Sequence, residues 1–233
     1  MDTALMSRSL RKLGLAAVLV TTLCVLAGCG SGANKANGIE KLDAVPAFLK
    51  SVDATRAAGD IEVTGRLPIN GVRTTVVSRF QGDVADATLT SSAGTVQVVR
   101  SGSDIYVKAG TKFWSKFVPA AQAKSLNGKW TKSNIEGSLR SFKTFVDKDT
   151  FFRASGNIKK GAVVTVDGRT LLPIKDPKDN TNSSWFIGTT GKPLLYRARI
   201  GANANYVFVY DKGGVIALPP DAIDASTFQL PIQ

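Results

Sequence analysis

Alternation of apolar and polar residues along most of the chain constrains the fold more than any other feature of the sequence. Two neighbouring runs each place apolar residues at every second or fourth position: Ile61, Val63 and Leu67, then Val72, Val76 and Phe80. Asn70-Gly71 lies between these runs and is typical of a two-residue hairpin turn. Side chains of a strand point alternately to its two faces, so this pattern predicts antiparallel strands with one covered face.

The same alternation continues in further segments that we expect to be strands. They cover residues 84–91, 94–100, 104–109, 113–117, 163–166, 169–174, 185–188, 194–200, 206–210 and 215–218. Asp167-Gly168 and the stretch 211–214 (DKGG) supply further hairpin signals. About eleven strands with hairpin spacing indicate one antiparallel sheet, and a sheet of that width must curl.

Three segments have helical spacing instead. In residues 39–57, Leu42, Val45, Leu49 and Val52 predict one helical face, with Pro46 marking either a kink or the true start of the helix. Residues 119–126 predict a short helix. Ser133 and Glu136 have the spacing of a capping box, and a stripe follows it: Ile135, Leu139, Phe142 and Val146. The sequence therefore predicts an α+β fold in which helices cover the concave face of a curled antiparallel sheet.

The first 29 residues have the order of a bacterial lipoprotein signal. Basic residues precede an apolar run over 13–26, and Leu26-Ala27-Gly28-Cys29 is similar to a lipobox, in which the cysteine receives a diacylglycerol. An ordinary secretory signal and an uncleaved anchor helix are the alternatives. We expect residues 1–28 to be a signal peptide and Cys29 to be the lipidation site.

Lipidation of Cys29 would fix the organisation of the remaining chain. Residues 29–38, which are small and polar, are expected to be a flexible tether. Residues 39–233 fit a single domain. The expected location is the outer face of the bacterial cytoplasmic membrane, with the membrane itself as a partner through the lipid anchor.

Catalytic chemistry has few candidate residues in this sequence. The chain contains no histidine and no Gly-x-Ser-x-Gly motif, which argues against the usual acyl-transfer triads. The stretch 176–182 offers oxygen ligands, but it lacks the glycine and distal glutamate of an EF-hand loop. The candidate carboxylate pairs lie in apparent turns, where aspartate is an ordinary capping residue: Asp83/Asp86, Asp147/Asp149 and Asp221/Asp224. We expect no enzyme, no cofactor and no bound metal.

The formal net charge of +12 requires an explanation. Lys108, Lys112 and Lys116 alternate with aromatic residues, a pattern that nucleic-acid-binding proteins also show. An exported chain rarely meets nucleic acid, so we expect none as a partner, and an anionic lipid headgroup at these three lysines is the nearer ligand. The ordinary interpretation is a generic solvated face.

Several short motifs, in this order, resemble LolA-like and LppX/LprG-like bacterial envelope lipoproteins. They are residues 102–108 (GSDIYVK) with Phe113-Trp114, residues 128–130 (GKW), 166–168 (VDG), 185–187 (WFI) with 191–194 (GKPL), and 211–215 (DKGGV) before 218–220 (LPP). The resemblance covers residues 39–228. It implies a half-barrel whose concave face, closed by helices, holds the acyl chains of a lipid or lipoprotein, without catalytic residues or cofactor.

Two functions follow from these expectations. The first is a lipoprotein that binds or carries a lipid or glycolipid, with an envelope transport protein as a further partner. Its expected acyl-chain contacts are Ile61, Val63, Val72, Val76, Phe80, Phe142, Leu194, Tyr196 and Ile200. The second is a non-catalytic envelope module, with a fully packed core, that binds a protein or senses a signal.

Overall fold

The computed structural model describes residues 35–154, 157–177 and 183–225. The chain divides into the units Met1–Ser31 and Gly32–Gln233, and every described residue belongs to the second. Cys29 and the other lipobox residues therefore lie outside the described part of the chain.

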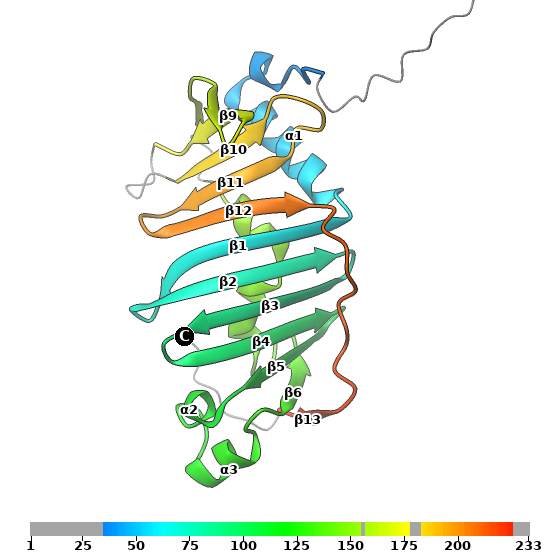
Figure 1. Cartoon of the computed structure of the whole chain (residues 1–233), viewed down its shortest axis with the longest axis vertical. Coiled ribbons are helices and arrows are strands. Elements are labelled where there is room, and N and C mark those ends of the chain that lie inside the picture. The colour runs from blue at the N-terminus through cyan, green and yellow to red at the C-terminus, as the bar shows by residue number, and fades with distance from the viewer. Residues whose placement is uncertain (1–34, 155–156, 178–182, 226–233) are drawn as a thin grey trace, which may run out of the picture. The chain divides into compact units, whose positions relative to one another are not determined.

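The described unit is built on one 13-stranded sheet (Figure 1). Its strands are β1 (Asp60–Ile69), β2 (Val72–Gln81), β3 (Val84–Ser91), β4 (Gly94–Ser101), β5 (Asp104–Ala109), β6 (Trp130–Asn134), β7 (Lys159–Lys160), β8 (Val164–Val166), β9 (Arg169–Lys175), β10 (Ser184–Gly188), β11 (Leu195–Ile200), β12 (Ala204–Tyr210) and β13 (Ala222–Asp224). Their spatial order is β13-β6-β5-β4-β3-β2-β1-β12-β11-β10-β9-β7, with β8 paired to β9 outside this path. All pairs are antiparallel except β13 with β6.

Hairpin turns set the register of this sheet, as the sequence predicts. Asn70 and Gly71 both have positive φ, 50° and 76°, and so do Asp167 and Gly168, 50° and 73°. These values match the two-residue turn whose twist suits a hairpin. The turn after β1 brings Ile69 opposite Val72 and carries the register through Asp60 opposite Gln81.

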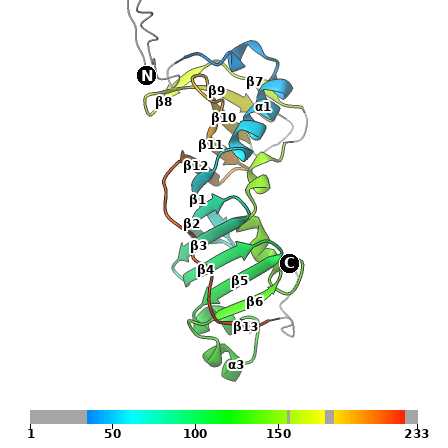
Figure 2. The ribbon, with the colours of Figure 1, turned by 90° about the vertical axis from the view of Figure 1, so that its right-hand side faces the viewer.

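Short helices lie on the concave face of the curled sheet (Figure 2). They are η2 (Ile39–Lys41), α1 (Ala44–Arg56), η3 (Arg140–Phe145) and η4 (Lys148–Phe152), while α2 (Thr111–Trp114) and α3 (Ala120–Ser125) follow β5 near one end of the sheet. The predicted α+β architecture is confirmed, with more strands and shorter helices than expected.

Aromatic side chains from these helices close the middle of the concave face. Phe151 of η4 packs edge-on against Phe80, Tyr206 and Phe208, with ring centroids 6.2, 5.0 and 5.5 Å apart. Phe48 of α1 packs in the same way on Trp185, with centroids 5.0 Å apart. Such edge-to-face contacts add to the burial of the rings themselves.

The predicted helix at 39–57 is present as α1, but only part of its predicted apolar face is buried. Val45 and Leu49 are 43% and 55% exposed, whereas Phe48 and Val52 are buried. Pro46 lies in the first turn of α1, where a missing N–H is tolerated. The apolar spacing alone could not separate the two faces, because apolar residues occupy both.

Three further sequence expectations are corrected by the structure. Ser133 belongs to β6, and its Oγ accepts a hydrogen bond from the Leu139 amide at 3.3 Å, so it caps no α-helix; the stripe behind it is nevertheless buried, partly on η3. Residues 113–117 form helical turns after Gly110 and no strand. Residues 215–218 form no strand either, and Val215 is 87% exposed.

The chain is already paired with the sheet before residue 39. Ala36 forms an isolated bridge with Thr190, and the Gly191 amide donates to the Lys35 carbonyl at 2.9 Å. Asn37 Nδ2 donates to the Gly188 carbonyl at 2.9 Å. Residues 35–37 of the expected tether are therefore held against the turn after β10.

Two buried hydroxyls on this sheet give opposite predictions for stability. Ser78 Oγ is buried and has no hydrogen-bond partner in the described structure, whereas Thr131 Oγ1 donates to the Val107 carbonyl at 2.9 Å. An unpaired buried polar group costs about 1–3 kcal/mol. Ser78→Ala should therefore raise the free energy of unfolding by about 1 kcal/mol, and Thr131→Val should lower it by about 1 kcal/mol. Urea unfolding measures both, and a loss of stability in Ser78→Ala would contradict the assignment.

Candidate functional site

A cavity of about 470 Å³, open to solvent, lies between the sheet and η3 near α2. We call it the apolar hollow. Its lining comes from the β1–β2 and β3–β4 hairpins, from α2 and the turn after it, and from η3: Ile69, Asn70, Val72, Thr74, Leu89, Ser91, Ala93, Gly94, Thr95, Val96, Gly110, Lys112, Phe113, Lys116, Phe117, Ser141, Phe142 and Phe145. Its volume falls in the range of small-molecule binding sites, about 300–1,000 Å³.

Aromatic rings dominate one wall of the apolar hollow. Phe113 lies at the centre of this wall, with its ring centroid 4.9 Å from that of Phe117 and 5.8 Å from that of Phe142. Phe113, Phe117 and Phe145 are only half-buried, although Phe113 and Phe145 pack on a buried core. Rings that remain half-exposed beside a cavity can bury more surface only when an apolar guest enters it.

The sheet supplies the opposite wall through alternate residues of one face. Val72 and Thr74 lie on β2, and Leu89 lies on β3. Farther along the same face of β2, Val76 and Phe80 are buried in the core. One face of a single strand therefore passes from packed core into open cavity.

Lys112 and Lys116 lie at the border of this cavity and are exposed. Hydrogen bonds from the amides of residues 115–118 to carbonyls three or four positions earlier continue the helical turns past α2. Residues four apart on such turns lie on one side, so both ammonium groups belong to the same rim. The lining contains no aspartate or glutamate, so the rim carries only positive charge.

The structure brings together four of the twelve side chains that the sequence nominated for lipid contact. Val72, Phe142, Lys112 and Lys116 line the apolar hollow. Four others, Ile61, Val63, Val76 and Phe80, are buried in the packed core, and Ile200 packs against its edge. Lys108 instead has its ammonium group 5.8 Å from the centre of the Trp130 ring and lines no described part of the hollow.

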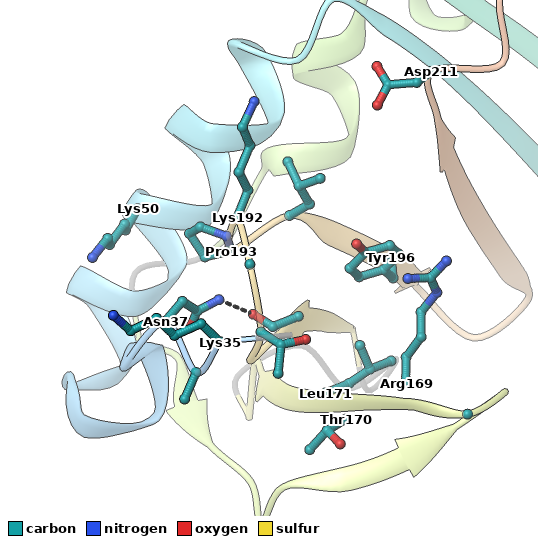
Figure 3. A pocket seen from close by; sticks show the side chains of 16 residues that line it. Lys35, Asn37, Lys50, Arg169, Thr170, Leu171, Lys192, Pro193, Tyr196 and Asp211 are labelled. Carbon is teal, nitrogen blue, oxygen red and sulfur yellow. Dashed lines mark hydrogen bonds between the residues drawn. The ribbon is translucent and has the colours of Figure 1, made fainter. Parts of the chain in front are cut away.

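The remaining two nominated residues, Leu194 and Tyr196, line a second cavity (Figure 3). We call it the basic hollow; it is open, measures about 1050 Å³ and lies beside the turn after β10. Lys35, Lys50, Arg169 and Lys192 line it, and Asp211 is the single acidic residue of the lining. The guanidinium carbon of Arg169 lies 4.5 Å from the centre of the Tyr196 ring, a cation–π contact.

The most central ring of the apolar hollow, Phe113, is not among the residues that the sequence predicts to contact a lipid. Phe113 was assigned to a strand, and Phe117 and Phe145 were not nominated. Phenylalanine is frequent in residues 113–117 and 142–152, but residues that line a cavity and residues of a packed core have the same pattern in a sequence.

Members of two of the acidic pairs considered from the sequence form ion pairs: Asp86 with Arg79 and Asp149 with Arg56. Asp147 caps η4, because its side chain accepts a hydrogen bond from the Asp149 amide at 3.1 Å. Within the described ranges, no group of three or more His, Cys, Asp or Glu residues could hold a metal ion. Residues 178–182 of the considered calcium loop lie outside these ranges. No helix among the described residues is long and apolar enough to cross a membrane.

The apolar hollow predicts different tolerance at two positions of β2. Val72 and Val76 lie on the same face, but Val72 borders the cavity and Val76 is fully packed. Overpacking a core costs about 1–3 kcal/mol. Val76→Phe should therefore lose about 1–3 kcal/mol of unfolding free energy, whereas Val72→Phe should lose less than about 0.5 kcal/mol. Equal losses in urea unfolding would mean that no usable space exists beside Val72.

No protein-family model matches the chain, and no curated protein sequence matches it. Solved structures are similar in fold. The lipoprotein LppX of Mycobacterium tuberculosis shares 17% identity at a TM-score of 0.46, over 74% of this chain and 99% of that one. LprF from Mycobacterium bovis shares 12% identity at a TM-score of 0.47, over 76% of this chain and 96% of that one. An uncharacterized conserved protein from Thermus thermophilus shares 7% identity at a TM-score of 0.45, over 76% and 96% of the two chains.

At such identities and TM-scores, the likeness carries no argument about what this chain binds. The case for a ligand therefore depends on the geometry of the apolar hollow and the basic hollow.

Proposed function

We propose that this protein is a non-catalytic envelope lipoprotein that holds the hydrocarbon of a lipid or glycolipid in the apolar hollow. The observation that carries the proposal is a cavity of about 470 Å³ on the concave face, bounded by phenylalanine rings and by the apolar face of β2 and β3. Burial of hydrocarbon in such a place is favourable by about 0.8 kcal/mol per methylene.

The rim of the hollow favours an anionic headgroup. Lys112 and Lys116 are the two charged residues of the lining, and both are exposed, so they can pair with a headgroup without leaving water. A charged ligand group near an exposed lysine gains modest attraction, which sets preference more than affinity. The tail would therefore supply most of the affinity and the rim the selectivity.

Anchoring forms the second part of the proposal. Residues 1–28 would be removed as a signal peptide, and Cys29 would carry the diacylglycerol. The chain from residue 29 to residue 34 would form the tether, since Lys35 is already hydrogen-bonded to the sheet. The described domain would then lie at the outer face of the cytoplasmic membrane, close to its lipid source and to any envelope transport partner.

Lipid retention is the direct test. Protein purified without detergent should show added lipid mass in native mass spectrometry, and Val72→Trp should weaken binding of the same lipid. If the indole displaces two or three methylenes, the loss is about 2 kcal/mol, or about thirty-fold in affinity. Val207→Trp is the matched control, because Val207 is 40% exposed on β12 and does not line the apolar hollow.

A headgroup arm completes the test. Lys112→Gln with Lys116→Gln should reduce the preference for anionic over neutral lipid, while Lys108→Gln with Lys129→Gln should leave it unchanged. A clean apo mass with no uptake of added lipid would contradict the proposal. Crosslinking in cells to one protein, without retained lipid, would favour the protein-binding module that a packed core predicts.

A further inference from the structure

We propose that the basic hollow and the outer face of α1 form a docking surface for the anionic phospholipid headgroups of the membrane that carries the anchor. This inference rests on the lipid anchor in the proposed function, but it concerns a different site, on the other half of the sheet from the apolar hollow.

The charges of the basic hollow come from four separate parts of the chain. Lys35 precedes η2, Lys50 lies on α1, Arg169 begins β9, and Lys192 lies in the turn after β10. Figure 3 shows Lys50 and Asn37 on one side of the hollow and Arg169 with Tyr196 on the other. The fold therefore gathers these cations around one open space.

These four cations are not neutralised within the part of the chain that the structure describes. None of them takes part in an ion pair there. Asp211 is the one carboxylate of the lining, and nearby Asp167 is already paired with Arg197. The surface therefore has an excess of positive charge that suits anionic headgroups.

The exposed face of α1 adds an apolar component beside the lysines. Val45 and Leu49 are one helical turn apart and are 43% and 55% exposed, and Lys50 follows directly. Apolar side chains next to lysines are typical of helices that lie in a membrane interface. Val45 and Leu49 are exposed on this protein, and a membrane interface would bury their apolar surface.

The length of the tether places this surface near the membrane. Cys29 is six residues from Lys35, and six extended residues reach at most about 20 Å. Lys35 lines the basic hollow and is held to the Gly191 amide through its carbonyl. Because the anchored cysteine cannot lie farther than this from the basic hollow, this end of the sheet stays next to the membrane.

Docking in this way would place the two cavities at different distances from the membrane. The apolar hollow is bordered by β1 to β4 and the basic hollow by β9 to β11, with β12 between them in the sheet. Four strand spacings, from β11 to β3, amount to roughly 19 Å. The docked domain would hold its lipid cavity away from the membrane surface, where a partner can reach it.

Amine labelling of the intact, acylated chain tests this proposal. The protein is reconstituted in vesicles of phosphatidylcholine, or of equal parts phosphatidylcholine and phosphatidylglycerol, and labelled lysines are quantified by mass spectrometry. Lys35, Lys50 and Lys192 should label several-fold more slowly on the phosphatidylglycerol vesicles. Lys124 lies on α3 and Lys129 follows it, near the other end of the sheet from β9 (Figure 1). Both are exposed, and they should label equally on the two kinds of vesicle.

Matched variants identify the charges that matter. Each cation near an anionic surface strengthens docking by about five-fold, so Lys50→Gln, Arg169→Gln and Lys192→Gln together should abolish the protection of Lys35. Lys108→Gln, Lys124→Gln and Lys129→Gln together remove the same charge and should preserve it. Equal labelling of Lys35, Lys50 and Lys192 on both vesicles would overturn the proposal. If soluble glycerol phosphate protects these lysines from labelling and anionic vesicles protect them no further, the site binds a small anion, and the docking proposal is overturned.

The intact mass of the protein shows whether Cys29 is acylated, which distinguishes a failure of the anchor from a failure of the docking surface. If Cys29 is not acylated, the same labelling can be measured with protein added to an excess of vesicles. Loss of bound lipid in the retention assay with intact protection of Lys35 would contradict the lipid-holding role and leave docking standing.

Discussion

The concave face of the sheet is wider than the helices that cover it, and the rest of the structure depends on this mismatch. Twelve strands in sequence across the sheet span roughly 50 Å, at about 4.8 Å per strand. Helix α1 has 13 residues and is about 20 Å long. The helices η3 and η4 are shorter than α1. Apolar residues on the concave face must therefore be covered by aromatic side chains, or remain open to solvent or to a guest.

Phenylalanine side chains cover the middle of the concave face but leave part of it, beside η3, uncovered. Phe151 contacts rings on β2 and β12, and Phe48 contacts Trp185 on β10, so aromatic rings cover the sheet at these places. Beyond η3, Phe113 and Phe142 meet at 5.8 Å but leave the hollow beside Val72 uncovered. The interior is neither a continuous half-barrel cavity nor a fully packed core, and the hollow gives a guest one place to bind.

Local signals in the sequence predicted the sheet well. The turns at Asn70-Gly71 and Asp167-Gly168 fix two hairpins, because their positive φ values are required by the turn and are tolerated by these residues. The helices were harder, since a face such as Val45 and Leu49 looks buried when only spacing is considered. Residues 113–117 are rich in the aromatic side chains that strands favour, but they form helical turns, because the hydrogen bonds that curl this segment start at Gly110.

The candidate site shows the same division between local and long-range information. Lys112 and Lys116 could be nominated because their charge stands out in a run of aromatics. Val72 and Val76 could not be separated, although one borders the cavity and the other is packed, because the difference comes from η3 folding back more than sixty residues later in the chain. The basic hollow likewise unites residues from Lys35 to Lys192, and no local pattern relates them.

Quenching of tryptophan fluorescence by a brominated fatty acid tests the central claim most directly. Trp114 is fully buried, with its ring 5.1 Å from that of Phe113 in the wall of the apolar hollow, whereas Trp185 packs on Phe48 at the other end of the sheet. In a chain with Trp130→Phe and Trp185→Phe, which leaves Trp114 alone, brominated chains should quench the emission strongly and saturably. A chain that keeps only Trp185 should show little quenching. Equal quenching of the two, or none of Trp114, would mean that hydrocarbon does not enter this end of the concave face.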